Sequence, residues 1–523
     1  MMTDEKLHRR EAPGQSSWSN RIMLLSLAGI LFLTLYPFQF AHAESARFLF
    51  PLSLNGWGKS IDLLDIFLNV LLFIPFGFGV GEKLRERGRS KAFTFFVVWA
   101  LGALLSYSVE FLQIYIPSRD SGWGDVITNS SGAAVGALMF DYMGAGVIAW
   151  FSTRERALES SLSLAKIGVL LFLYMGLWCV LVGPLQKQTK VVNWTRDSFL
   201  VLGNSASLRP AAPWKGKISE LDIWNRAIPN QMAEKLTAAP MMADPPLAPL
   251  IDYKFSGSAP FRDARQFLPS LDWATRAPSP ENAGAEFDGQ SWLISAGPVP
   301  TLVSSVETTG HFAMRLICEP AGSTESDARI FSLSSPTGAV NMDLGQDGSA
   351  LAFWFRNPLS MRRVRMTWIV PQVFVSKQTR NLLLSFNGTA LSLFINGRDY
   401  GHPYEFGPGL ALAHYVRRVK TAELKGYGYI FYAMIFFPAG CLLGFAWRKS
   451  GLRWIGRACF LAASYFLPAF VIEWVLADAA ARALSFENVW FCMLLTLAAS
   501  LWINADRNFS HVMRHEHEPV SVR

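Results

Sequence analysis

The stretch SYSVEFLQIYIPSRDSGWGDVITNSSGAAVG (residues 106–136) decides the fold class, because it combines the end of one apolar helix, a short polar turn and the start of another helix. Glu110 and Gln113 lie one helical turn apart before the polar turn, and Asp125 and Asn129 lie one turn apart after it. Charges in hydrocarbon cost roughly 2.5–3.5 kcal/mol each on insertion scales, so they need a structural or functional reason. The stretch predicts a hairpin of membrane helices with polar side chains near one end.

The composition of the whole chain agrees with a membrane protein. Of its 523 residues, 51% are hydrophobic and 17% are charged, whereas an average soluble domain carries roughly 25% charge. The 18 Trp and 39 Phe residues exclude disorder as the main state. Five Cys residues without any CxxC spacing exclude a disulfide framework and a zinc ribbon.

Eight apolar stretches are long enough to span a bilayer, which requires about 20 residues. They are residues 22–40, 61–81, 92–116, 126–151, 167–185, 427–447, 458–477 and 489–503. The first is interpreted as an anchor, because its apolar run is longer than that of a usual signal peptide, although Ala41-His42-Ala43 resembles a cleavage site.

Lys and Arg residues alternate between the two sides of these spans. The segments that would face one side hold 19 of them, and the three short loops on the other side hold 4. By the positive-inside rule both termini are cytoplasmic. The net charge of +8 is therefore a topology signal, and we expect no nucleic-acid partner.

These spans divide the chain into five parts, and the segment between the fifth and sixth spans is expected outside the membrane. The expected parts are a cytoplasmic tail (1–21), a membrane domain with a fifth helix (22–185), an extracytoplasmic domain (186–425), a C-terminal three-helix membrane region (426–504) and a second cytoplasmic tail (505–523).

Polar residues of the second, third and fourth spans all fall in the outer half of the bilayer. The candidate ligand residues are Asp65, Asn69, Glu110, Gln113, Arg119, Asp125 and Asn129. We expect them to line one pocket that opens outward, with Arg119 at its rim. Gly132 and Gly136 have the spacing that lets helices approach closely. The alternative is that the polar groups only bond one another and hold three helices in register.

No His occurs in any of the spans. Histidine-based catalysis and most transition-metal sites are therefore not expected in the membrane interior. No residue pattern calls for a metal or another cofactor, so none is expected.

With TLYPF (34–38) and DIFLNVLLFIPFG (65–77), the stretch 106–136 resembles the VanZ-like family of bacterial membrane proteins, which is named for a teicoplanin-resistance protein. The resemblance covers residues 22–185. It implies a multi-pass protein of the bacterial inner membrane with a role in the cell envelope, related to antibiotic resistance in one member, and it implies no particular substrate.

A shift of 363 positions aligns this region with the C-terminal spans. It pairs Glu110 with Glu473, Arg119 with Arg482, and the string FIPFG with FFPAG. The shift predicts a second, degenerate copy, so that two parallel repeats are related by an axis along the membrane normal. The other candidate positions change: Asp65 to Gly428, Asn69 to Tyr432, Gln113 to Leu476, Asp125 to Asn488 and Asn129 to Cys492.

Short alternating strands separated by Asn-Gly and Asp-Gly turn signals predict an all-β jelly-roll sandwich in the outer domain. LSLFINGRDYG (391–401) resembles a late hairpin of laminin-G-like, concanavalin A-like lectin/glucanase jelly rolls, and LIDYKFSG (250–257) resembles their opening strand. WKGKISELDIWNRAIP (214–229) resembles their closing strand although it comes first, so the order looks circularly permuted. This resemblance implies binding of glycan or protein, sometimes with calcium, but no Asp/Asn cluster identifies a calcium site.

The sequence therefore predicts a polytopic α-helical membrane protein with about eight transmembrane helices and an outer β-sandwich. Its expected role is binding: a glycan or protein outside, and a lipid headgroup or glycolipid in the membrane pocket. Two alternatives stay open. One is an intramembrane enzyme for a lipid-linked substrate, with Glu110 or Asp125 as general acid or base and Arg119 on a phosphate. The other is a transporter, whose sign would be helices broken near Pro75 or Pro438.

Overall fold

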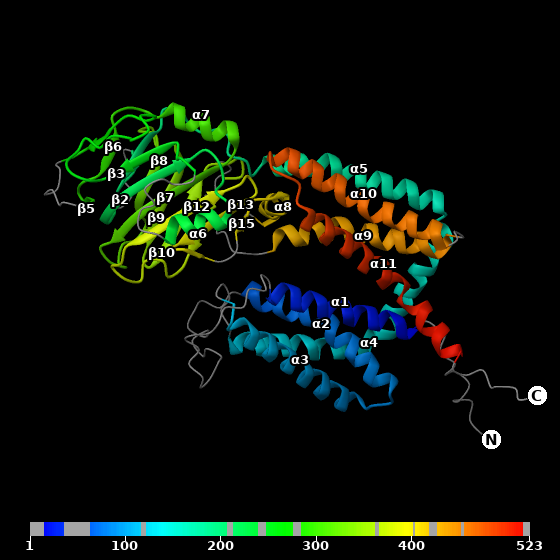
Figure 1. Cartoon of the computed structure of the whole chain (residues 1–523). Helices are drawn as coiled ribbons and strands as arrows, with labels where there is room; N and C mark the ends of the chain where they lie inside the picture. Colours follow the sequence, from blue (N-terminus) through cyan, green and yellow to red (C-terminus); the bar gives the residue numbers. More distant parts are fainter. Residues whose placement is uncertain are drawn as a thin grey trace, which may run out of the picture. The chain divides into compact units, whose positions relative to one another are not determined.

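The structure is a computed structural model, and it describes residues 15–35, 63–116, 122–206, 213–238, 247–275, 284–360, 366–400, 403–417, 426–450 and 454–515. Within these residues, eight helices are long and apolar enough to cross a membrane, which confirms the predicted polytopic membrane protein (Figure 1). They are α1 (Gln15–Leu35), α2 (Leu63–Glu86), α3 (Lys91–Gln113), α4 (Trp123–Ser161), α5 (Leu164–Lys187), α9 (Tyr427–Lys449), α10 (Trp454–Ala480) and α11 (Phe486–His515). Both α2 and α9 are continuous helices with Pro75 and Pro438 inside them.

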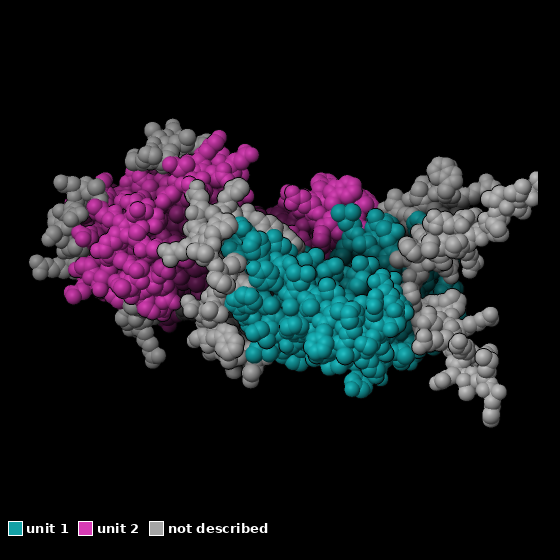
Figure 2. Space-filling model, turned by 90° about the horizontal axis from the view of Figure 1, so that it is seen from below, with its two compact units in different colours: residues 1–174, 436–465, 494–523 teal, residues 175–435, 466–493 magenta. Residues whose placement is uncertain are grey.

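The chain forms two compact units, coloured separately in Figure 2. The first comprises residues 1–174, 436–465 and 494–523, and the second comprises 175–435 and 466–493. The division falls inside four of the helices, whereas the sequence suggested boundaries near 185 and 425. Within the second unit, the end of α5 packs with the outer domain: Gln186 Nε2 donates to the carbonyl of Phe406 over 3.2 Å.

Close contact between α2 and α4 organises the first unit. A Cβ atom at Gly132 would overlap the carbonyl of Val70, and one at Gly136 would overlap the carbonyl of Ile74. Gly77 on α2 approaches the carbonyl of Ala133 in the same way. Only glycine permits this separation, so the geometry agrees with the packing role expected for Gly132 and Gly136.

A buried charge cluster in the same unit joins α1 and α4 to α9. Glu155 on α4 accepts from Arg21 Nη1 at 3.0 Å and from Arg448 Nη1 at 2.9 Å. The side chains of Arg21 and Arg448 are only 2% and 6% exposed. Removing one partner of such a buried set leaves an uncompensated charge, which is strongly destabilising.

The second unit contains two antiparallel sheets, which confirm the predicted β-sandwich. The first sheet has the order β11 (Trp368–Val370), β10 (Ala350–Phe355), β9 (Val340–Asp347), β8 (Ala328–Ser334), β1 (Phe199–Leu202), β6 (Leu293–Ser295) and β4 (Leu271–Trp273). The second has the order β14 (Arg398–Asp399), β13 (Ala390–Ile395), β12 (Arg380–Phe386), β7 (Phe312–Pro320), β2 (Lys215–Trp224) and β3 (Ile251–Lys254), with β15 (Tyr404–Glu405) on β13 and β5 (Ala285–Asp288) on β2. Three short helices accompany the sheets: α6 (Asn230–Ala238), α7 (Pro300–Thr309) and α8 (Pro408–Arg417).

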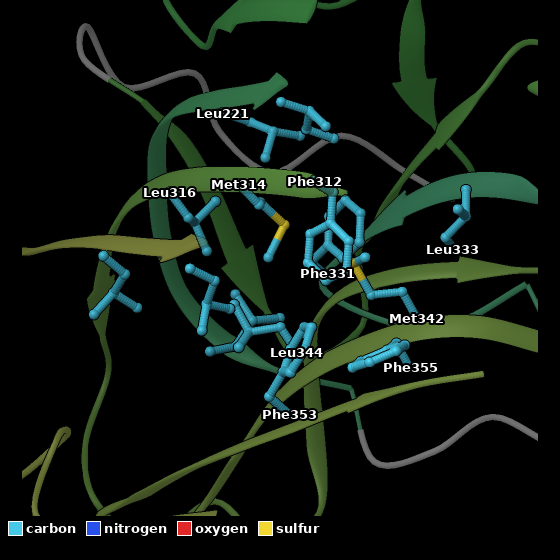
Figure 3. Packing of buried hydrophobic residues seen from close by; sticks show 14 of the residues in the cluster. Leu221, Phe312, Met314, Leu316, Phe331, Leu333, Met342, Leu344, Phe353 and Phe355 are labelled. Carbon is cyan, nitrogen blue, oxygen red and sulfur yellow. The ribbon is translucent and has the colours of Figure 1, made fainter. Parts of the chain in front are cut away.

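The core lies between the facing surfaces of these sheets. Figure 3 shows Phe312 and Met314 of β7 near Phe331 of β8, Leu344 of β9 and Phe353 of β10, and all five side chains are buried. Alternation of apolar residues places them on the inner faces. The predicted Asn-Gly turn is present between β13 and β14, where Asn396 and Gly397 have φ of 50° and 81°. Positive φ at both positions is what a two-residue hairpin requires.

Candidate functional site

The predicted polar residues of α2, α3 and α4 are connected by hydrogen bonds. Asn69 Nδ2 on α2 donates to Asp125 Oδ1 at the start of α4 over 2.8 Å. Asn129 Nδ2, one turn further along α4, donates to Ser106 Oγ on α3 over 2.9 Å. Asn129 is buried, whereas Asp125 is partly exposed. The contacts place an amide and a carboxylate side by side where α2 and α4 meet.

Glu110 contacts the residue that precedes α4. Its side chain is 2% exposed, and its Oε2 atom accepts the backbone N–H of Gly122 over 2.8 Å. Gly122 is the N-cap residue of α4, so this carboxylate lies at the positive end of a helix dipole and fixes the turn between α3 and α4. This contact is the one expected of a structural carboxylate.

Gln113 faces α1. Its Nε2 atom donates to the carbonyl of Thr34 over 2.8 Å, and the Thr34 hydroxyl in turn donates to the carbonyl of Ile30. Gln113 thus attaches the end of α3 to the end of α1. The structure brings Asn69, Asp125 and Asn129 together through Ser106 and places Gln113 at a different helix contact.

The side chains of two predicted residues, Asp65 and Arg119, lie outside the described part of the structure. Asp65 belongs to α2, and Arg119 lies in the undescribed segment 117–121. Ser106 and Thr34 are not among the residues that the sequence predicted for the site. Ser106 is a hydroxyl residue one turn before Glu110 in an apolar span, and this signal could have identified it.

Glu473 on α10 is the centre of a denser set of contacts in the second unit. Its Oε1 atom accepts from Arg482 Nη1 at 2.6 Å and from the backbone N–H of Ser485 at 2.9 Å. Its Oε2 atom accepts from Asn488 Nδ2 at 3.2 Å and from the Tyr432 hydroxyl at 3.5 Å. Glu473 and Arg482 thus form an ion pair, and both oxygens of the carboxylate accept hydrogen bonds from protein groups.

Several contacts recur at a spacing of 363 residues. Helices α3 and α10 begin at Lys91 and Trp454, and helices α4 and α11 begin at Trp123 and Phe486. The recurring contacts are Glu110 with Gly122 and Glu473 with Ser485, the approach of Gly77 to Ala133 and of Gly440 to Thr496, and the side-chain pairs Arg85–Asp141 and Arg448–Asn504.

The Asn69–Asp125 site can bind polar groups of a ligand. Asn69 and Asp125 can donate to and accept from hydroxyl or phosphate groups of a ligand. Among the described residues there is no group of three or more His, Cys, Asp or Glu side chains that could hold a metal ion.

The outer domain has a hollow of its own, with a volume of about 580 Å³. Five hydroxyl residues of α7 line one side, and Arg196, Asn225 and Phe267 contribute to the rest. Asn225 Nδ2 donates to Ser305 Oγ over 2.9 Å, which orients the amide at the wall of the hollow. Hydroxyl, amide and guanidinium groups beside an aromatic ring suit a hydroxyl-rich ligand.

The eight membrane helices and the β-sandwich define the class of the protein: a multi-pass membrane protein with one folded domain outside the helices. Residues 9–144 match the family model VanZ/LLP1, so the chain carries a VanZ-like membrane domain, which indicates an envelope-associated function. No curated protein and no solved structure matches the chain significantly.

Proposed function

We propose that the protein is a VanZ-like protein of the bacterial inner membrane whose Asn69–Asp125 site binds a lipid headgroup or glycolipid, while its outer domain binds an envelope glycan. Both termini are cytoplasmic in this proposal, as the alternation of basic segments indicates. The observation that carries it is a difference in polar residues between two sets of helices whose packing contacts recur.

An internal duplication relates the two sets of helices. The glycine approaches, the Arg85–Asp141 type of pair and the carboxylate at the helix start recur 363 residues later. A degenerate second copy explains why contacts between residues far apart in sequence recur in the same register. The contacts that both copies keep are the ones that the helix packing needs.

The second copy serves as an internal control for the first. It keeps a carboxylate at Glu473 but has Tyr432, Asn488 and Cys492 in place of Asn69, Asp125 and Asn129. Helix packing of this type therefore does not need the amide–carboxylate set of the first copy. A polar group that lies within a membrane span and has no packing role marks a functional site in a membrane protein, which supports the assignment of Asn69 and Asp125 to a ligand and of Glu110 to structure.

The glycan part of the proposal rests on the outer domain. Strand β2, which resembles a closing strand of laminin-G-like domains, lies directly beside β3, which resembles their opening strand. A circular permutation requires this adjacency, because the original termini must be neighbours. The hydroxyl-lined hollow beside α7 is the proposed sugar site.

Copurified lipid tests the membrane part. The intact chain is purified in mild detergent, and its bound lipids are quantified by mass spectrometry relative to the membrane extract. We expect Asp125→Asn to lower the enriched lipid about tenfold, which corresponds to about 1.4 kcal/mol, with a midpoint of thermal unfolding within about 2 °C of the wild type. Asn488 shows that an amide is tolerated at the matching position.

Two further variants make the result decisive. Asn488→Ala, the matched control, should keep the lipid, and Glu110→Gln should lower thermal stability because it weakens the bond to the Gly122 N–H. The ligand assignment is refuted if Asp125→Asn retains the lipid. It is also refuted if this variant loses thermal stability in parallel with the lipid. For the outer domain, Asn225→Ala should weaken cosedimentation of the intact protein with envelope polysaccharide, and unchanged sedimentation rejects the hollow as the sugar site.

A further inference from the structure

A second hollow, of about 960 Å³, lies in the first unit at the ends of α2 and α3 and along α4. Arg85 of α2 and Lys91 of α3 line it, and α4 contributes Asp141, Tyr142 and Trp150. It is formed next to the turn between α2 and α3, at the opposite end of these helices from the Asn69–Asp125 site. The hollow is thus independent of the function proposed above.

The charge of its lining is positive. Arg85 Nε lies 3.1 Å from Asp141 Oδ1, and Arg85 Nη1 donates to the carbonyl of Arg89 over 2.5 Å. Lys91 Nζ lies 5.9 Å from the centre of the Tyr142 ring. The lining therefore contains two cations and one carboxylate, and the Arg85 side chain is still 31% exposed.

Arg448, 363 residues after Arg85, shows how such a guanidinium is satisfied by protein groups. Its Nη1 atom lies 2.9 Å from Glu155 Oε1 and 3.5 Å from Glu159 Oε2, and its Nε atom donates to Asn504 Oδ1 over 3.1 Å. Its side chain is only 6% exposed. Arg85 has a single carboxylate partner in the described structure and faces a hollow, where an external anion can take the place of the missing carboxylates. A guanidinium binds phosphate oxygens particularly well, because its fork of N–H donors matches their geometry.

The remaining wall is apolar and exposed. Tyr142, Met143 and Trp150 are 83%, 49% and 56% exposed. Aromatic residues of this kind are enriched at the level of lipid headgroups. The adjoining segment 82–91 carries five Lys and Arg residues, which places this end of the helices on the cytoplasmic side.

We infer that this hollow binds the phosphate headgroup of an anionic phospholipid from the cytoplasmic leaflet. Arg85 and Lys91 contact the phosphate, and the α4 side chains contact the glycerol and the first part of the acyl chains. Basic pockets at the cytoplasmic ends of transmembrane helices are suited to anionic headgroups, because the surrounding leaflet is itself negative and supplies the ligand.

Native mass spectrometry of the intact chain in detergent tests the inference, with separate titrations of phosphatidylglycerol and of phosphatidylcholine with the same acyl chains. We expect phosphatidylglycerol to bind more tightly than phosphatidylcholine. The double variant Arg85→Gln/Asp141→Asn should weaken its binding about tenfold, in keeping with the loss of a charge-assisted hydrogen bond. The second substitution prevents Asp141 from being left without its partner, and Asn504 shows that an amide fits at the corresponding position.

Arg87→Gln is the matched control, because Arg87 is an exposed cation of the same segment that does not line the hollow. It should change binding less than twofold. Equal affinity for both lipids, or an equal effect of Arg87→Gln, would overturn the inference, as would competition by glycerol phosphate at the concentration at which the lipid binds. If the double variant does not fold, Lys91→Gln decides: unchanged binding of phosphatidylglycerol by that variant also rejects the site.

Discussion

Asp222 and Glu220 on β2 share one guanidinium on the neighbouring strand β7. Arg315 Nη1 lies 2.8 Å from Asp222 Oδ2 and 2.9 Å from Glu220 Oε2, and Arg315 Nε donates to Asn381 Oδ1 over 3.1 Å. Burial raises the pKa of Asp222 from 3.8 to about 6, against the opposing effect of Arg315. One cation is not enough to offset the loss of water around this carboxylate.

This pKa shift predicts a pH dependence of stability. The pKa of Asp222 is higher in the folded than in the unfolded chain, so the folded state holds the proton more tightly. The contribution of Asp222 to the free energy of unfolding is therefore largest below about pH 4 and is lost as the pH rises to about 6; it amounts to about 3 kcal/mol at most. Asp222→Asn should make the midpoint of thermal unfolding of the intact protein depend less on pH between pH 4.5 and 6.5.

Asp272→Asn provides the control for this experiment. Asp272 is an exposed residue of β4 in the other sheet, where it accepts from the N–H of Trp273. Its substitution should leave the pH profile almost unchanged. A profile of Asp222→Asn as steep as that of the wild type would show that Asp222 does not hold a proton in this range.

At the scale of elements, the crossing of α2 and α4 depends on the lack of side chains at Gly77, Gly132 and Gly136. Each of these glycines approaches a carbonyl of the facing helix. The backbone of one helix thereby fills the space in which the other would carry a Cβ atom. The equivalent approach of Gly440 to the carbonyl of Thr496 indicates the same requirement between α9 and α11.

We expect Gly77→Ala to destabilise the protein, because its Cβ atom would overlap the Ala133 carbonyl and backbone atoms cannot move aside cheaply. A loss of about 1–3 kcal/mol is typical of overpacking, and thermal unfolding in detergent measures it. Gly29→Ala in α1 is the control, since a Cβ atom there meets nothing within 4 Å. If both variants unfold at the same temperature, the close crossing of α2 and α4 is wrong.

At the scale of the whole molecule, cysteine chemistry can test the orientation in the membrane. Cys318 lies on β7, is buried, and has a pKa raised to about 12 by burial. Its thiol is therefore protonated and inaccessible in the folded protein, so Cys318 should not react with a labelling reagent. Lys377 and Ser160, by contrast, are exposed positions on the outer domain and on α4.

Labelling of spheroplasts with a membrane-impermeant maleimide should modify Lys377→Cys directly, and Ser160→Cys only after the membrane is permeabilised. Cys318 should react only after denaturation. Peptide mass spectrometry distinguishes the three sites. Reaction of Ser160→Cys in sealed spheroplasts would reverse the orientation that the basic segments indicate.

The sequence by itself determined the elements of this protein. Apolar length predicted the eight membrane helices, period-two alternation predicted the strands around Phe312 and Phe331, and Asn396-Gly397 predicted a tight turn. It also identified most of the polar residues of the candidate site. These features depend on local properties, because the length of an apolar run, side-chain periodicity and backbone conformation are set by residues close together in the chain.

Only the tertiary structure decided which of these residues meet. Gln113 donates to the carbonyl of Thr34 in α1. Glu110 accepts from the Gly122 N–H, and Asp125 accepts from Asn69. The tertiary structure likewise fixed the order of strands in the sheets and joined Glu155 to both Arg21 and Arg448. Such pairings join residues from tens to hundreds of positions apart, and helix packing and strand register choose among many partners of the same chemistry, which local sequence cannot do.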